Sequence, residues 1–287
     1  MKKILRYILI PLVLLIIFMC TACNESLIAE EPREIVSENN LSVHYIDVGQ
    51  GDSTFICLPN GETILIDAGE QDAAEHVIEY IENIGIQRID YLIGTHPHSD
   101  HIGGLSDVIN SFEIGKMYMP KVSHTSKTFE NLLDAIEENN VDVYSAKAGV
   151  VICDEEELTV KMLAPVSEEY EELNDYSAVI KLEYGETSFL FMGDAEKYSE
   201  NEITESVDVD VLKVGHHGSK SSSSKEFLYS VMPEIAVISV GRDNSYGHPS
   251  KPVVRRLEEI GAEVLRTDEL GDILIESDGE SLYIKEG

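Results

Sequence analysis

Hydrophobic and polar residues alternate with changing period along the chain after residue 40. Alternation, or short apolar runs between turn residues, predicts strands at 41–48, 53–58, 63–67, 89–94, 116–119, 141–144, 158–163, 177–184, 188–192, 209–214 and 235–240. Helical spacing predicts helices at 73–83, 129–139, 253–260 and from Leu105 onwards. Strands and helices that follow one another without a further linker predict one large α/β domain over residues 41–287, with two similar strand-rich halves.

The first forty residues follow a different pattern. Three positive residues precede an almost unbroken apolar run at 8–19, which is typical of a secretory signal. The run ends in Thr-Ala-Cys, which resembles a bacterial lipobox, although Cys20 stands where that motif usually has leucine. We therefore predict a lipoprotein signal peptide at 1–22, a lipid on Cys23 that anchors the protein to the outer face of the cytoplasmic membrane, and a flexible acidic tether at 23–40. An uncleaved membrane anchor is the alternative, and it also places the domain outside the cytoplasm.

Composition limits the partners and the covalent structure. The formal net charge is −33, which argues against a sequence-independent grip on a long nucleic acid, because such a grip needs clustered Lys and Arg. Cys57 and Cys153 lie in apolar runs, so we expect buried thiols, and a disulfide between them stays open for a domain outside the cytoplasm. The sequence does not indicate an oligomeric state.

The candidate chemistry is concentrated in residues 95–104, Thr-His-Pro-His-Ser-Asp-His-Ile-Gly-Gly. Imidazole and carboxylate groups together form the usual ligand set of a catalytic metal site. The segment follows the predicted strand 89–94 and precedes a helical pattern, so these side chains lie at the carboxyl end of a strand, where layered α/β folds usually carry their sites. A solvated polar loop is the alternative interpretation.

Other predicted strands end in residues that can also bind metal. Four groups follow predicted strands in this way: Asp67, Asp194, the pair His216 and His217, and His248. Their repeated return to one sheet edge is what a two-metal hydrolase needs. Imidazoles would hold the first ion and a carboxylate–histidine pair the second, while a shared carboxylate would keep the ions roughly 3.5–4 Å apart around a bridging hydroxide.

The sequence resembles the metallo-β-lactamase superfamily over nearly all of the domain. The supporting motifs are the histidine cluster and residues 44–52, 65–69, 212–219 and 246–249. More narrowly, the chain is similar to the hydrolase domain of the competence-protein (ComEC/Rec2) group, here as a stand-alone lipoprotein, with phosphorylcholine-esterase-type relatives nearby. The resemblance implies a four-layer αββα sandwich.

The resemblance also implies roles for individual residues. The implied metal ligands are His96 and His98 at the first site, Asp100 and His101 at the second, Asp194 as the bridge, and His216 completing the second site. Asp67 would orient the histidine loop from behind. The sequence hardly distinguishes His217 from His216 as the ligand. His217 would pack beside the site or contact the substrate. His248 would hydrogen-bond a phosphoryl oxygen or protonate the leaving group, unless it only caps local backbone.

One departure from the superfamily pattern concerns the first metal. Most dinuclear members have another histidine before the hairpin that ends at Asp194, but residues 172–177 contain none and carry Asn174 and Asp175 instead, as in the competence group. An oxygen ligand or water would then replace an imidazole, which weakens zinc and favours manganese. We therefore expect two divalent ions, zinc or manganese, with the first held more weakly. His124 could substitute only if its loop folded back.

The combined prediction is a membrane-tethered, metal-dependent hydrolase outside the cytoplasm. A phosphodiesterase of nuclease or phosphocholine-esterase type, acting on a small or short phosphodiester, fits these motifs best. Asp100 and His248 are the predicted catalytic residues. Two alternatives remain: an amide or lactam hydrolase on the same scaffold, and a non-catalytic lipoprotein that uses the metal site for binding.

Overall fold

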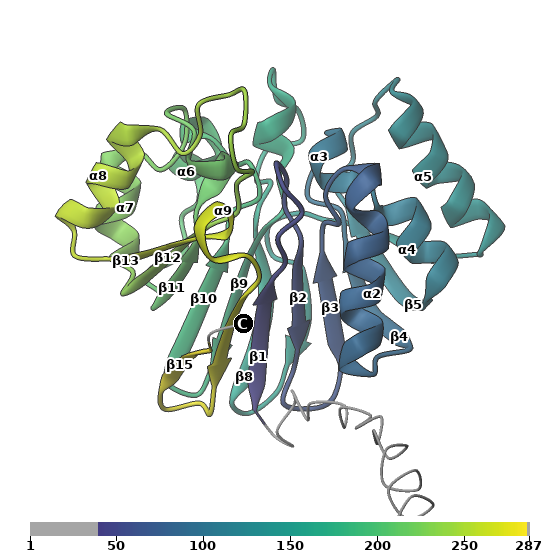
Figure 1. The fold of residues 1–287 in the computed structure, drawn as a ribbon, viewed down its shortest axis with the longest axis horizontal. Coiled ribbons are helices and arrows are strands. Elements are labelled where there is room, and N and C mark those ends of the chain that lie inside the picture. Colours follow the sequence, from purple (N-terminus) through teal and green to yellow (C-terminus); the bar gives the residue numbers. More distant parts are fainter. Residues whose placement is uncertain (1–39, 286–287) are drawn as a thin grey trace, which may run out of the picture. The chain divides into compact units, whose positions relative to one another are not determined.

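Two β-sheets lie face to face in the computed structural model, which describes residues 40–285 (Figure 1). The predicted signal peptide, and the predicted tether apart from residue 40, lie outside the described residues. The strand order of the first sheet is β15-β14-β1-β2-β3-β4-β5-β6, and that of the second is β13-β12-β11-β10-β9-β8-β7.

The strands are short, as expected from the short apolar runs of the sequence. The first sheet contains β1 (Leu41–Tyr45), β2 (Thr54–Cys57), β3 (Thr63–Ile66), β4 (Arg88–Ile93), β5 (Glu113–Met119), β6 (Val143–Ser145), β14 (Ile273–Ser277) and β15 (Leu282–Lys285). The second contains β7 (Val151–Asp154), β8 (Leu158–Ala164), β9 (Val179–Tyr184), β10 (Thr187–Phe191), β11 (Val211–Lys213), β12 (Ile235–Ile238) and β13 (Glu263–Arg266).

Helices cover the outer faces of both sheets (Figure 1). The first sheet carries η1 (Gln71–Ala73), α2 (Ala74–Ile84), α3 (Ser99–Ile102), α4 (Leu105–Ser111) and α5 (Lys127–Glu138). The later part of the chain contributes η2 (Leu173–Tyr176), α6 (Lys197–Glu202), η3 (Gly215–Gly218), α7 (Lys225–Val231), α8 (Lys251–Glu259) and α9 (Thr267–Leu270). The predicted four-layer αββα sandwich is therefore confirmed. Among residues 40–285, none of the helices has the length and apolar character needed to cross a membrane.

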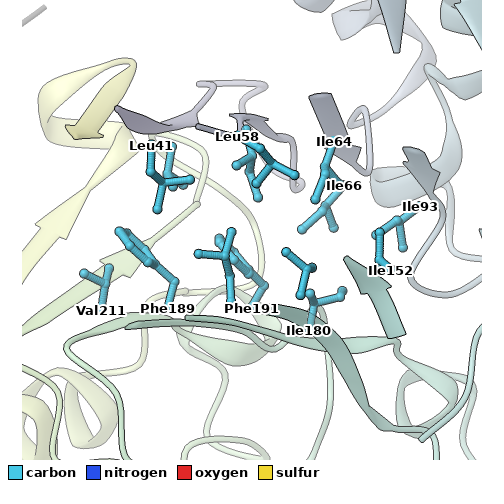
Figure 2. Close-up of a cluster of buried hydrophobic side chains, with 14 of the residues drawn as sticks. Leu41, Leu58, Ile64, Ile66, Ile93, Ile152, Ile180, Phe189, Phe191 and Val211 are labelled. Carbon is cyan, nitrogen blue, oxygen red and sulfur yellow. The ribbon is translucent and has the colours of Figure 1, made fainter. Parts of the chain in front are cut away.

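Strand alternation explains how three apolar layers are built. Phe189 and Phe191 of β10 point between the two sheets, where Figure 2 shows them facing residues of the first sheet such as Leu41. The intervening Leu190 packs on the other face, against α7 and α8. The same division on the first sheet places Ile56 between the sheets and its neighbour Phe55 under the helices. These central strands thus contribute to two cores, which fixes their register.

Parallel strands bring the candidate side chains to one edge. β3 pairs with β4, and β10 with β11, in parallel. Asp67 follows β3, the histidine loop follows β4, Asp194 follows β10 and the two adjacent histidines follow β11. The carboxyl ends of these strands therefore meet across the two sheets, as expected for an α/β fold.

Several elements go beyond the sequence expectation. The edge strands β7, β13 and β15, the inner strand β14 and the short helices α6 and α7 were not predicted. Their apolar patterns are short, and helices of six or seven residues depend on packing more than on propensity. Cys57 and Cys153 are both buried and unpaired, so the described residues contain no disulfide between them.

Candidate metal centre

Three metal-competent side chains lie close to one oxygen of Asp194. The donor atoms of Asp100, His101, Asp194 and His217 all lie within 4.8 Å of one another. His101 Nε2 is 3.2 Å and His217 Nε2 is 3.5 Å from Asp194 Oδ1. Asp100 Oδ2 adds a second carboxylate, 3.3 Å from His217 Nε2. We call this set the second side of Asp194.

The other oxygen of Asp194 faces a different group of imidazoles. His96 Nε2 is 3.9 Å and His216 Nε2 is 3.6 Å from Asp194 Oδ2. His98 Nδ1 is 3.0 Å from His96 Nε2, so two imidazole nitrogens point at each other. We call His96, His98 and His216 the first side. Each oxygen of Asp194 thus faces its own donors, as a bridging carboxylate would require.

The buried polar atoms of the second side lack hydrogen bonds. His101 Nε2, Asp194 Oδ1 and His217 Nε2 are inaccessible to solvent, and although the two nitrogens lie 3.2 and 3.5 Å from that oxygen, none of the three atoms has a partner in hydrogen-bond geometry. An unsatisfied buried polar atom is costly, and three that converge on one point indicate a missing ligand. Imidazole nitrogens and carboxylate oxygens suit zinc or manganese, so these residues fit a divalent cation.

Opposite charges set the ionisation of the second side. Burial opposes protonation of His217, but Asp194 and Asp52 outweigh it and raise its pKa to about 10. Burial alone would raise the pKa of Asp100, but His101 and His217 lower it to about 2. On the first side, burial holds the pKa of His96 well below its ordinary value. Without metal, the second side is therefore a network of ion pairs, and His96 is a neutral imidazole.

Asp67, the residue expected to orient the histidine loop, lies behind His101. His101 donates from Nδ1 to Asp67 Oδ2 at 2.7 Å, which leaves Nε2 directed at Asp194. The hydroxyl and the backbone N–H of Thr95 donate to the two oxygens of Asp67 at 2.6 and 2.8 Å. A carboxylate behind a metal-binding imidazole fixes its tautomer and ring orientation.

Asp52 has the corresponding place behind His217, and the sequence reasoning missed it. Its Oδ1 lies 3.2 Å from His217 Nδ1, and its Oδ2 accepts a 2.6 Å hydrogen bond from Lys213 Nζ. Both Asp52 and Lys213 are buried. Gly51 is needed at this point, because a Cβ there would collide with the carbonyl oxygen of Asp100. A lysine inside the apolar strand run 209–214 was the available signal, since a buried ammonium needs a carboxylate partner.

The turn η3 carries both adjacent histidines. His216 and His217 each have a φ of 50°, which is uncommon for residues other than glycine. The turn is fixed by hydrogen bonds from His216 N to Gly193 O and from Ser222 Oγ to Gly215 O. The structure brings His217, and not His216, into the second side; the prediction had given this place to His216. Residue spacing does not reveal the two positive φ values that separate the rings.

Asn174 and Asp175 occupy different surroundings although they are neighbours. Asn174 Nδ2 donates to Glu196 Oε1 at 3.2 Å and lies 3.3 Å from His216 Nδ1. Asp175 instead accepts a 3.2 Å hydrogen bond from the backbone N–H of Ser199. Asn174 therefore belongs to the first side, whereas Asp175 holds the start of α6.

The remaining candidate histidines lie at different distances from the centre. The His248 ring is 5.5 Å from the His216 ring and 6.4 Å from the His217 ring, centre to centre. Its Nδ1 is buried without a hydrogen-bond partner. His124 Nδ1 accepts a 3.3 Å hydrogen bond from Ser126 N at the start of α5. His248 thus lies beside the two adjacent histidines, and His124 has a local partner.

Comparison with known proteins identifies the class. The family model of the metallo-beta-lactamase superfamily matches residues 46–242, and the chain belongs to this superfamily of metal-dependent hydrolases. ComE operon protein 3 of Bacillus subtilis is 34% identical over 251 residues, which are 80% of this chain and 32% of that protein. Recombination protein 2 of Haemophilus influenzae is 29% identical over 257 residues, 88% of this chain and 31% of that protein. The chain spans about a third of the length of these curated relatives. The predicted relation to the competence group is confirmed.

Solved structures share the fold. The metallo-beta-lactamase fold protein YhfI from Bacillus subtilis superposes with a TM-score of 0.55 at 11% identity, covering 83% of this chain and 100% of that chain. The metallo hydrolase Igni18 from Ignicoccus hospitalis gives a TM-score of 0.53 at 14% identity, covering 81% and 98%. At these identities the likeness concerns the fold alone.

Proposed function

We propose that this chain is a phosphodiesterase that uses two divalent cations, zinc or manganese, and acts on a small or short phosphodiester outside the cytoplasm. The observation that carries the proposal is the division of donors between the two oxygens of Asp194, with three unsatisfied buried atoms on one side. Two such cations supply charge for the phosphoryl oxygens and activate the attacking water.

Side chains behind the imidazoles hold the site in position before metal or substrate binds. Asp67 accepts from His101 Nδ1, and His217 Nδ1 hydrogen-bonds Ser239 O at 3.1 Å with Asp52 Oδ1 3.2 Å away, so both Nε2 atoms stay directed at Asp194. Asp100 adds negative charge and faces His217, in keeping with its predicted catalytic role. Because the rings and carboxylates are already held in place, little reorganisation is needed when a substrate binds.

His248 is proposed to act on the leaving group. Its Nδ1 is buried and lacks a partner, and its ring lies beside His216. Burial and the neighbouring His216 lower the pKa of His248, so the ring is neutral at pH 7. A neutral imidazole can donate a hydrogen bond to a phosphoryl or leaving oxygen through its N–H.

The charge of the chain supports a small substrate. At a formal net charge of −33, a long polyanion would be repelled, whereas one phosphodiester group can be neutralised by the cations themselves. The names of the relatives refer to competence and recombination, so short nucleotides are one substrate class to test.

The test is hydrolysis by the purified full-length chain in detergent. Bis-p-nitrophenyl phosphate and nitrocefin are assayed side by side with Mn²⁺ or Zn²⁺, and again after EDTA. We expect metal-dependent cleavage of the phosphodiester and none of the lactam, with activity abolished in Asp194→Ala and His101→Ala. Lactam cleavage alone would support the amide-hydrolase alternative. Absence of all hydrolysis with metal fully bound would favour the binding lipoprotein.

We also propose that a lipid on Cys23 anchors the protein to the outer face of the cytoplasmic membrane. The support is the apolar run that ends in Thr-Ala-Cys. Cys23→Ser is expected to abolish labelling by radioactive palmitate. Labelling that persists in Cys23→Ser would contradict this assignment without affecting the proposed activity.

A further inference from the structure

We propose that His216 is a metal ligand of the first side, together with His96 and His98, and that it replaces the histidine absent from residues 172–177. The inference rests on the proposed two-metal function. It assigns adjacent histidines of one turn to two different cations, His216 to the first and His217 to the second.

The first argument is the oxygen that each histidine faces. His216 Nε2 lies 3.6 Å from Asp194 Oδ2, the same oxygen that His96 Nε2 approaches at 3.9 Å. His217 Nε2 lies 3.5 Å from the opposite oxygen, Oδ1. Since a bridging carboxylate presents one oxygen to each ion, His216 shares an ion with His96 and not with His217.

The second argument is the carboxylate behind the His216 ring. His216 donates from Nδ1 to Glu196 Oε1 at 3.0 Å, and Ser221 Oγ donates to the same oxygen at 2.9 Å. Asn174 Nδ2 is a further donor to it at 3.2 Å. This repeats the Asp67–His101 arrangement of the second side, in which a carboxylate holds Nδ1 and leaves Nε2 for the metal. Glu196 is therefore a positioning residue for His216.

The third argument is the backbone of η3. Both histidines adopt the left-handed conformation, with φ values of 50°, and their rings are turned 72° from each other. Two successive non-glycine residues in this region are strained, and such strain persists where the surroundings determine it. Here it directs one imidazole to each oxygen of Asp194.

Asn174 explains how the first side tolerates the missing histidine. Its amide donates from Nδ2 to Glu196 Oε1 at 3.2 Å and lies 3.3 Å from His216 Nδ1. The residue at this place therefore helps to hold Glu196, the carboxylate that accepts from His216. We infer that the third imidazole of the first side comes from η3.

The experiment counts zinc ions bound by the full-length chain in detergent. Metal-stripped protein is titrated with Zn²⁺ by calorimetry, and bound zinc is measured by mass spectrometry after dialysis. We expect two ions per chain in the wild type and one in His216→Ala. His216→Asn is the second variant, because asparagine tolerates a positive φ and keeps the turn folded. His76→Ala, which removes a half-exposed histidine paired with Asp272, is the matched control and should bind two.

Double variants identify which ion is lost. If His216 and His96 serve the same ion, His96→Ala/His216→Ala still binds one zinc. If His216 and His217 serve different ions, His216→Ala/His217→Ala binds none. Glu196→Gln is expected to weaken only the ion lost in His216→Ala, by about 10–100-fold, as is typical when the partner behind a ligand is removed.

The outcomes separate this inference from the proposed function. Two ions bound with wild-type affinity in both His216→Ala and His216→Asn would overturn the assignment and leave the two-metal phosphodiesterase intact. A double variant of His216 and His217 that still binds one ion would also overturn it. A wild-type chain that binds no ion would instead refute the proposed function.

Discussion

The two sides of Asp194 differ in burial and in the groups that hold their histidines. On the second side, the side chains of His101 and His217 are 0% and 2% exposed, and buried carboxylates hold both rings. On the first side, the His216 side chain is 21% exposed and its partner Glu196 is 23% exposed. The nearest groups to His96 Nδ1 are the hydroxyls of Thr95 and Ser177. The histidines of the second side are therefore buried and held by charged groups, with Asp100 beside them 25% exposed, whereas the first side combines the fully buried His96 with the partly exposed His216.

This difference suits the two sides to two tasks, tight binding of a cation and binding of the substrate. A closed set of charged donors binds a cation tightly, because the donors are already held in place. An open set with weaker supports leaves room for a ligand from solution, as catalytic metal sites require. We therefore expect the second side to hold the tighter ion and the first side to receive the substrate.

The largest effect is expected from Asp194→Asn, which removes the group that joins the two sides. The amide cannot supply a negative oxygen to both ions, so bound zinc should fall and kcat/KM on bis-p-nitrophenyl phosphate should drop to background. Zinc analysis beside the kinetic assay checks this. Retention of both ions with ordinary activity would show that Asp194 does not bridge.

Lys213→Met should lower the free energy of unfolding of the metal-free protein. Lys213 is 2% exposed and pairs with Asp52 at 2.6 Å, so its loss leaves a buried carboxylate without its cation. Removing one partner of a buried ion pair costs about 3–5 kcal/mol. Urea denaturation of the metal-free protein measures this loss. Adding Asp52→Asn should recover part of it, because the unpaired charge is then gone; a loss below about 1 kcal/mol would contradict the pairing.

The carboxylates behind the histidines should affect one ion each. Asp67→Asn and Asp52→Asn are expected to weaken the tighter zinc ion by about 10–100-fold, and Glu196→Gln should weaken only the other. Calorimetric titration of the three variants makes the comparison. Equal losses at both ions in all three would show that the two sides are not independent.

The affinity for zinc should also depend on pH on the second side and not on the first. Zinc must displace protons from the second side, where His217 has a pKa of about 10, whereas burial keeps the pKa of His96 and His98 below its ordinary value. Affinity for the tighter ion should thus rise about tenfold per pH unit for each displaced proton between pH 7 and 9, and affinity for the other should stay flat. Calorimetry in buffers of different ionisation enthalpy counts the protons. A flat profile for the tighter ion would contradict the ion-pair network.

Much of the fold follows from the hydrophobic pattern. The apolar runs around Leu65 and Leu190 predict strands, and the structure contains them as β3 and β10, which are buried on both faces. Strands β14 and β15 escaped prediction because their runs are short and because the pairing of β14 with β1, to which β15 is added, is set by tertiary contacts.

The site was predictable where residues are contiguous and less so where it depends on backbone angles. The structure brings the cluster around His96 and His101, which follows a strand of the first sheet, together with Asp194, which follows a strand of the second. His216 and His217 could not be separated, because their positive φ values are not encoded in residue spacing. Asp52 and Glu196 were missed since a carboxylate next to a turn or before a helix reads as an ordinary polar residue.

The most direct test of the account is anomalous diffraction from crystals of the full-length protein loaded with zinc. We expect two zinc peaks, one at each oxygen of Asp194, with His217 Nε2 bound to the ion at Oδ1 and His216 Nε2 bound to the ion at Oδ2. A single peak, or two peaks with both histidines on the same ion, would contradict the division of the site into two sides.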